Sequence, residues 1–184
     1  MNFPPLILAS KSPRRQELLS LLGLEFRVVL KEVDESYPEH LSPEEVAVYI
    51  AEKKAKAFDE DITGEVVITA DTLVVIDGQI LGKPDDAAHA FEILSQLSGR
   101  THEVITGVCL LKDHKLYSFY EKSEVHFRHL TPEQIQYYIA TGQPMDKAGA
   151  YGIQEWIGLV GIEKIVGSYS NVVGLPTHRL YEEL

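Results

Sequence analysis

Two hydroxyl and two guanidinium groups lie within six residues near the start of the chain, in the segment Ser10-Lys-Ser-Pro-Arg-Arg15. A strand pattern precedes this segment and a helical pattern follows it, so Ser12 is expected to cap a helix with Pro13 in its first position. A helix N-terminus binds anions, and arginine binds phosphate oxygens bidentately. An ordinary capped helix with solvated arginines is the alternative, although cations there are unfavourable unless an anion is present. The pattern predicts a polyphosphate site formed by Ser10, Ser12, Arg14 and Arg15.

A carboxylate follows an apolar, β-rich run at Asp71-Thr72, and a second β-rich run begins directly after it. Ligands of α/β proteins bind beyond the carboxyl ends of central strands, which is where Asp71 is expected. Its carboxylate could bind Mg²⁺ or act as a general base toward water, and the alternative is an aspartate in a turn. Glu35, in an acidic run with Glu32 and Asp34, could complete the metal site. A solvated acidic run is the competing interpretation of that cluster.

Lysines at two places could bind the phosphates of a ligand. Lys83 is held between a glycine and a proline, so it has little freedom and could reach a phosphate as a point charge. One of Lys53, Lys54 and Lys56 must lie near the apolar face of its helix. A turn lysine in solvent and a solvated helix face are the respective alternatives.

The glycine-rich segment from Met145 to Gln154 permits a close approach of the backbone to a ligand. Within it, Lys147 supplies a positive charge, and Gln154 supplies an amide that can read a nucleobase through hydrogen bonds. The alternative is a glycine-rich surface loop without a ligand.

The hydrophobic pattern predicts the elements that must position these residues. Strands are expected at residues 6–9, 26–30, 66–70, 73–76, 104–111, 116–127, 159–160 and 164–166. Helices are expected after Ser12, Ser42 and Thr131, where Ser/Thr and Pro start signals occur, and over residues 85–97. Because strands and helices alternate early and antiparallel pairs appear in the middle, the sequence predicts a mixed α/β sheet. No linker is evident, so residues 1–184 are expected to form one domain.

The composition is that of a globular protein, with 184 residues of which 45% are hydrophobic and 24% charged. The formal net charge of −11 disfavours nucleic acid and anionic lipid as partners. No apolar run reaches the ~18–20 residues of a membrane span, and the N-terminus lacks the basic region of a signal peptide. The single cysteine, Cys109, is expected to be a buried thiol. We therefore expect a cytoplasmic protein with no membrane or nucleic-acid partner.

Taken in order, these motifs resemble the Maf family of nucleoside triphosphate pyrophosphatases, also called septum-formation-inhibitor-like proteins. The matching segments are Leu8-Ala-Ser-Lys-Ser-Pro-Arg-Arg15, Lys54-Ala-Lys-Ala57, Ala70-Asp-Thr72, Leu81-Gly-Lys-Pro84, Leu97-Ser-Gly99 with His102, and Asp146-Lys-Ala-Gly-Ala-Tyr-Gly-Ile-Gln154. The resemblance implies a fold like that of the inosine triphosphate pyrophosphatases, with an elongated mixed β-sheet flanked by helices and two lobes around a cleft. It also implies a homodimer.

The resemblance implies cleavage between the α and β phosphates of a nucleoside triphosphate. It makes Asp71 the catalytic carboxylate and places Arg14, Arg15, Lys54 and Lys83 around the triphosphate. As a hypothesis, Asp71 holds a divalent cation, Mg²⁺ or Mn²⁺, together with Glu35, and activates the attacking water.

Base preference divides the family, and Arg14, Thr72 and Gln154 resemble the branch similar to the dTTP/UTP pyrophosphatases. The sequence departs from many relatives at Glu155-Trp156, where they continue with glycine, and this places an indole beside the expected base pocket. We therefore expect hydrolysis of dTTP and UTP, with modified pyrimidine nucleotides as further candidates. A 7-methyl-GTP pyrophosphatase and a nucleotide-binding regulator of cell division are the alternatives.

Overall fold

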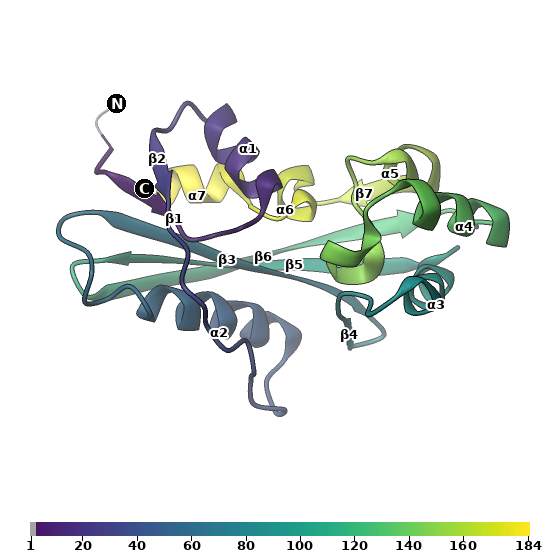
Figure 1. Cartoon of the computed structure of the whole chain (residues 1–184), viewed down its shortest axis with the longest axis horizontal. Coiled ribbons are helices and arrows are strands. Elements are labelled where there is room, and N and C mark those ends of the chain that lie inside the picture. Colours follow the sequence, from purple (N-terminus) through teal and green to yellow (C-terminus); the bar gives the residue numbers. More distant parts are fainter. Residues whose placement is uncertain (1–2) are drawn as a thin grey trace. The chain divides into compact units, whose positions relative to one another are not determined.

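The computed structural model describes residues 3–184. Its strands form a seven-stranded sheet in the order β2-β1-β3-β5-β6-β7, with β4 paired to β3 (Figure 1). The strands are β1 (Leu6–Leu8), β2 (Phe26–Val28), β3 (Val66–Ile76), β4 (Gln79–Leu81), β5 (Thr101–Lys112), β6 (Lys115–Phe127) and β7 (Ile162–Val166). Strand β1 pairs in parallel with β2 and β3, whereas β4 is antiparallel to β3 and β7 is antiparallel to β6. The prediction of a mixed sheet is confirmed.

Seven α-helices and two short 3₁₀ helices accompany these strands in the described part of the chain. They are α1 (Pro13–Leu21), α2 (Pro43–Lys56), α3 (Ala87–Leu97), α4 (Pro132–Thr141), η1 (Pro144–Asp146), η2 (Ala148–Ala150), α5 (Trp156–Gly161), α6 (Tyr169–Val173) and α7 (Thr177–Glu183). The predicted starts are confirmed, because the side chains of Ser12, Ser42 and Thr131 each accept a backbone N–H three residues on. Each of these caps is followed by proline in the first helical position, where its missing N–H costs nothing.

The chain forms two compact units. The first unit comprises the chain up to Thr72 together with Thr106–Glu121 and Gly174–Leu184, and the second comprises Leu73–Ile105 and Lys122–Val173. Strands β3, β5 and β6 each contribute residues to both units.

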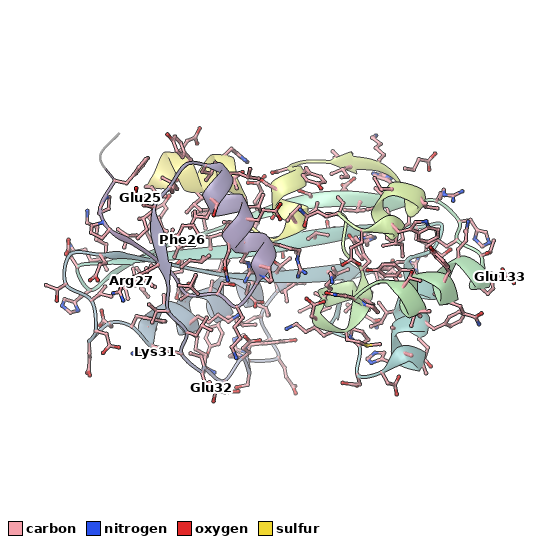
Figure 2. All side chains as sticks on the ribbon, turned by 45° about the horizontal axis from the view of Figure 1, so that its top comes forward. Glu25, Phe26, Arg27, Lys31, Glu32 and Glu133 are labelled. Carbon is pink, nitrogen blue, oxygen red and sulfur yellow. The ribbon has the colours of Figure 1, made fainter. Side chains whose placement is uncertain are left out.

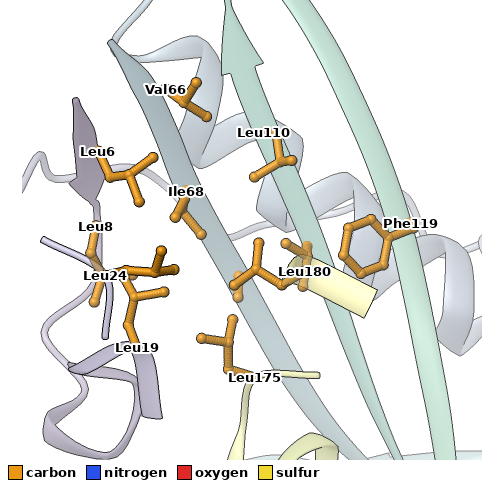
Figure 3. Close-up of a cluster of buried hydrophobic side chains, with 12 residues drawn as sticks. Leu6, Leu8, Leu19, Leu24, Val66, Ile68, Leu110, Phe119, Leu175 and Leu180 are labelled. Carbon is orange, nitrogen blue, oxygen red and sulfur yellow. The ribbon is translucent and has the colours of Figure 1, made fainter. Parts of the chain in front are cut away.

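Both faces of the sheet are buried in the first unit. On one face, side chains of β1, β3, β5 and β6 pack with residues of α1 and α7 in a cluster whose members include Leu6, Leu8, Leu19, Val66, Ile68, Leu110, Phe119 and Leu180 (Figure 3). On the other face, the alternate residues Ile7, Val67, Cys109 and Leu111 pack with Ala51, Ala55 and Phe58. Burial on both faces explains why β1, β3 and β5 contain continuous apolar runs, whereas the sequence of β6 alternates.

Helix α2 lies close against β5 at Gly107. A Cβ atom at this position would lie 2.3 Å from the carbonyl oxygen of Ala47, so only glycine allows this approach. Cys109, two residues further on, is buried as predicted, and burial raises the pKa of its thiol to about 11. The thiol is therefore protonated and unreactive at neutral pH, and its role is packing beneath α2.

The second unit buries an aromatic cluster around His102. The imidazole makes edge contacts with the rings of Phe127 and Tyr151, and its Nε2 lies 2.8 Å from Tyr151 Oη. Burial, together with a smaller contribution from the charge of His126, lowers the pKa of His102 to about 4. His102 is therefore neutral at physiological pH. In the same unit, α3 packs against α4 and the two 3₁₀ helices.

Charged side chains cover the surfaces of both units. Arg27, Glu32 and Glu133, for example, are exposed (Figure 2). Among residues 3–184, no helix has both the length and the apolar character needed to cross a membrane.

Two local predictions were wrong. The runs 66–70 and 73–76 form one strand, β3, because Asp71 and Thr72 interrupt the apolar pattern without interrupting the strand. Asp71 therefore lies in the middle of a strand and not beyond a carboxyl end, where the sequence predicted it. The predicted strand at Leu159-Val160 lies in α5, where the N–H of Leu159 donates to the carbonyl of Glu155 at 3.3 Å. A short apolar run does not distinguish a helix from a strand, and here the tertiary structure selects the helix.

Candidate active site

In the first unit, Lys54 lies between two carboxylates. Its Nζ is 2.8 Å from Asp71 Oδ1 and 2.9 Å from Glu35 Oε1. The side chains of Lys54 and Asp71 are only 18% and 14% exposed, whereas that of Glu35 is 56% exposed. Partial burial strengthens the Lys54–Asp71 ion pair relative to one in open solvent. The structure thus brings together three residues that the sequence predicted for the site.

The position of Lys54 on α2 distinguishes it from its two neighbouring lysines. Val46, Ala47, Ile50, Ala51 and Ala55 are the buried residues of this helix. Lys54 adjoins that buried face and reaches Asp71, whereas Lys53 binds Asp34 at the surface and Lys56 lies 3.6 Å from Glu52. The sequence pattern required one lysine near the apolar face, and the structure identifies it.

Arg15 is bound to four acceptors of the first unit. Its Nε donates to Gly174 O at 2.8 Å, and one terminal nitrogen donates to Ala70 O at 2.9 Å and to Ser10 Oγ at 3.3 Å. The other terminal nitrogen donates to Thr72 Oγ1 at 2.9 Å. The guanidinium therefore joins the segment before α1, the middle of β3 and the segment before α7.

These contacts lie on both sides of the Asp71 carboxylate, because Ala70 and Thr72 are the neighbours of Asp71. The Thr72 hydroxyl is also 2.9 Å from the buried Thr106 hydroxyl. Burial lowers the pKa of Arg15, as does the charge of Arg14, while Asp71 and Glu35 act in the opposite direction. Arginine stays protonated despite such a shift. Arg15 thus stabilises the backbone that carries Asp71.

The two serines before α1 shape its N-terminus. Ser10 is buried, and its Oγ accepts the N–H of Ser12 at 3.2 Å. Ser12 Oγ caps the helix by accepting the N–H of Arg15 at 3.4 Å. Arg14 lies in the first turn and is half-buried. The predicted residues of this segment therefore lie together at a helix N-terminus, the part of a helix that attracts anions.

The predicted residues of the second unit lie on two neighbouring segments. Lys83 is exposed two residues after β4, and the residue between them, Gly82, accepts the N–H of Gly149 at 3.1 Å. Gln154 is exposed and lines an open groove of about 480 Å³, together with Leu159, Lys164 and Tyr169 among others.

Lys147, in contrast, is buried. It is 4% exposed, and its Nζ lies 2.8 Å from Glu155 Oε1 and 2.7 Å from Asp146 Oδ1. The ammonium also donates to the carbonyl of Gln143. Three acceptors from its own segment therefore surround the positive charge.

Glu155 is the residue of this unit that sequence reasoning missed. Its Oε1 binds Lys147, and its Oε2 accepts a hydrogen bond from Tyr138. Burial raises the pKa of Glu155, but the hydrogen bonds from Lys147 and Tyr138 and the charge of Lys147 outweigh it, so the pKa is lowered. The neighbouring Trp156 ring packs at 4.8 Å against Tyr137, so the indole has its own partner on α4. A buried lysine requires a carboxylate, but the burial of Lys147 is seen only in the structure, so the sequence carried no signal for Glu155.

Asp71 and Glu35 could supply two carboxylate ligands to a divalent cation, but they do not form a complete set of protein ligands. Within residues 3–184, no group of three or more His, Cys, Asp or Glu side chains could hold a metal ion. Asp71 and Glu35 nevertheless converge on a single ammonium group. Mg²⁺ is often bound by one or two carboxylates plus phosphate oxygens of the substrate, and this pair fits that pattern.

Comparison with known proteins gave consistent matches. The family model described as Maf-like protein matches residues 5–184. Curated proteins named dTTP/UTP pyrophosphatase from Bacteroides thetaiotaomicron and Phocaeicola vulgatus are 51% and 52% identical to this chain, over 97% of it and 94% of their own length. The solved structure of the Staphylococcus aureus Ham1 protein covers 98% of this chain and all of its own, with a TM-score of 0.53 and 16% identity. That likeness confirms the predicted fold class.

Proposed function

Because the chain belongs to the Maf-like protein family, we propose that it is a nucleoside triphosphate pyrophosphatase that hydrolyses dTTP and UTP. The products are the nucleoside monophosphate and pyrophosphate. The structural observation that carries the proposal is the partly buried carboxylate of Asp71, joined to Lys54 and, through it, to Glu35. This arrangement places a base and a positive charge together in a site of reduced solvent access.

Asp71 is the general base of the proposed reaction. Its carboxylate takes a proton from water, and the water oxygen forms a bond to the α-phosphorus. The bond from this phosphorus to the α–β bridging oxygen breaks, and pyrophosphate leaves with the electron pair. Lys54 orients the carboxylate through the 2.8 Å contact and contributes positive charge near the phosphate oxygens.

Asp71 and Glu35 are the residues that would hold a divalent cation, Mg²⁺ or Mn²⁺. When bound, the cation would supply charge neutralisation for the phosphate oxygens.

The remaining residues are assigned within each unit. In the first unit, Arg14 and the N-terminus of α1, with Ser10 and Ser12, bind phosphate oxygens, while Arg15 and Thr72 position the strand at Asp71. In the second unit, Lys83 contributes a point charge and Gln154 contacts the base. Lys147 is not assigned a contact with the substrate, because its ammonium is buried among acceptors of its own segment. Its role is to hold neighbouring residues in place.

The experiment that tests this function is pyrophosphate release by purified protein with Mg²⁺. The panel comprises dTTP, UTP, CTP, the purine triphosphates and 7-methyl-GTP. Release mainly from dTTP and UTP, abolished by EDTA, supports the proposal. Release mainly from 7-methyl-GTP would contradict the assignment of the base, and binding without release would favour the regulator.

We also propose that the protein is cytoplasmic, as its composition led us to expect, and that it forms a homodimer, as the family resemblance implies. Sedimentation of the purified protein tests the assembly. A sedimentation coefficient of the 20.6 kDa monomer over the concentration range of the assay would contradict it.

A further inference from the structure

Gln154 is an exposed residue between buried neighbours. Gly152 and Ile153 are buried on one side of it, and Glu155 is half-buried on the other. The N–H of Glu155 donates to Gly152 O at 3.0 Å, so residues 152–155 form a turn with Gln154 near its tip. The direction of the Gln154 amide therefore depends on what holds Gly152 and Glu155 in place.

A buried polar cluster holds both of these residues. Tyr138 is the pivot, because its hydroxyl accepts the N–H of Gly152 at 3.1 Å and donates to Glu155 Oε2. The other oxygen of Glu155 lies 2.8 Å from Lys147 Nζ. The cluster thus binds the backbone before Gln154 and the side chain after it.

Packing around Gly152 leaves the turn little freedom. A Cβ atom at this position would lie 2.9 Å from Lys147 Cε and 2.9 Å from Glu155 Cδ. Trp156 adds a second attachment through its edge contact with Tyr137. Two consecutive residues of α4 therefore hold two consecutive residues after Gln154, and this explains the Glu155-Trp156 pair.

The charged side chains of this cluster are bound by other protein groups and do not bind a substrate directly. Both oxygens of Glu155 have protein partners, and Lys147 is bound by Asp146 as well as by Glu155. Hydrogen bonds and the charge of Lys147 keep Glu155 ionised, so the ion pair persists at neutral pH. Because the charged atoms of Glu155 and Lys147 are bound by protein partners, these side chains act by fixing the geometry of the residues around them.

We propose that Glu155, Tyr138 and Lys147 are positioning residues that orient Gln154 and thereby set the preference of the enzyme for its base. The inference rests on the proposed function, which assigns Gln154 to the base. It adds that a buried cluster of Lys147, Glu155 and Tyr138, which does not contact the substrate, controls base preference through Gln154.

The test compares Glu155→Gln with wild type by kcat and KM for dTTP and CTP. The substitution keeps the size of the side chain and leaves Asp146 to balance Lys147, so folding should be retained. We expect KM for dTTP to rise with little change in kcat, and the preference for dTTP over CTP to fall about tenfold, since a small misplacement of a contacting group suffices for such a loss. Tyr138→Phe removes the pivot hydroxyl and should have the same effect. Glu92→Gln, an exposed substitution on α3 of the same unit and outside the groove that Gln154 lines, serves as the matched control and should leave the preference unchanged.

A double-mutant cycle separates positioning from simple destabilisation. If Glu155 acts through Gln154, Glu155→Gln should cause no further loss of preference in the Gln154→Ala background. An equal loss in both backgrounds, or a fall in kcat for all nucleotides with the preference intact, overturns the inference. A preference that Gln154→Ala leaves unchanged also overturns it, yet leaves the pyrophosphatase assignment standing. That assignment fails only if the wild type releases no pyrophosphate.

Discussion

Lys54 Nζ lies 2.8 Å from Asp71 Oδ1 in the first unit, and the same ammonium lies 2.9 Å from Glu35 Oε1. One lysine on α2 therefore binds a carboxylate from the middle of β3 and another from the loop before α2. Because Asp71 and Lys54 are mostly shielded from solvent, their interaction is screened less than a surface pair. This relationship makes the roles of both residues testable with isosteric substitutions.

Asp71→Asn should lower kcat for dTTP by about 10²–10⁴-fold, because the amide cannot accept a proton from water. The substitution conserves shape, so thermal unfolding and nucleotide binding should stay close to those of the wild type. Steady-state kinetics and calorimetric nucleotide titration measure the two properties. Asp34→Asn is the matched control, since Asp34 pairs with Lys53 at the surface. Turnover by Asp71→Asn at a substantial fraction of the wild-type rate would falsify the base assignment.

Lys54→Gln should reduce kcat/KM by about 10²-fold, because it removes the positive charge beside the carboxylates. Lys53→Gln, one residue earlier on the same helix, removes an equal charge whose partner is the exposed Asp34. It should change kcat/KM by less than about twofold, in line with the small effect of exposed ion pairs. Equal losses in the two variants would contradict the special role of Lys54.

Arg15→Lys should destabilise the protein although it keeps the positive charge. A lysine cannot reach four acceptors in different directions, so some polar groups around Gly174, Ala70 and Thr72 lose their donor. We expect the free energy of unfolding in urea to fall by about 1–3 kcal/mol. The exposed Arg27→Lys control should change it by less than about 0.5 kcal/mol. Unchanged stability with weakened nucleotide binding would instead make Arg15 a phosphate ligand.

His102 should make folding stability depend on pH in the acidic range. Its pKa falls from 6.5 in the unfolded chain to about 4 in the fold, so the unfolded state binds the proton more tightly. The contribution of the neutral imidazole is complete above pH 6.5 and is lost as the pH falls toward 4, by about 3 kcal/mol in total.

This dependence is measured as the free energy of unfolding between pH 7 and pH 4. His102→Phe removes the titrating group, so its stability should fall less steeply with acid than that of the wild type. His178→Gln replaces an exposed histidine and should retain the wild-type slope. Parallel pH profiles for His102→Phe and the wild type would show that His102 does not contribute.

Much of the local structure could be predicted because its causes are local. Hydroxyl caps followed by proline specified the starts of three helices, and those starts lie where expected. The apolar runs around Leu6–Leu8 and Val66–Ile68 indicated strands, and both segments are strands in the structure, which buries both of their faces. The two errors, at Asp71-Thr72 and Leu159-Val160, occur where a short pattern is compatible with two structures.

The sequence by itself determined which chemical groups are available at the candidate site, because their types and order are encoded along the chain. Only the tertiary structure decided which of three lysines binds Asp71, that Arg15 is bound by four protein acceptors, and that Glu155 neutralises Lys147. Each of these outcomes depends on distances between groups on different elements. The strength of a charged contact changes steeply with separation and burial, and neither quantity can be read from spacing along the chain.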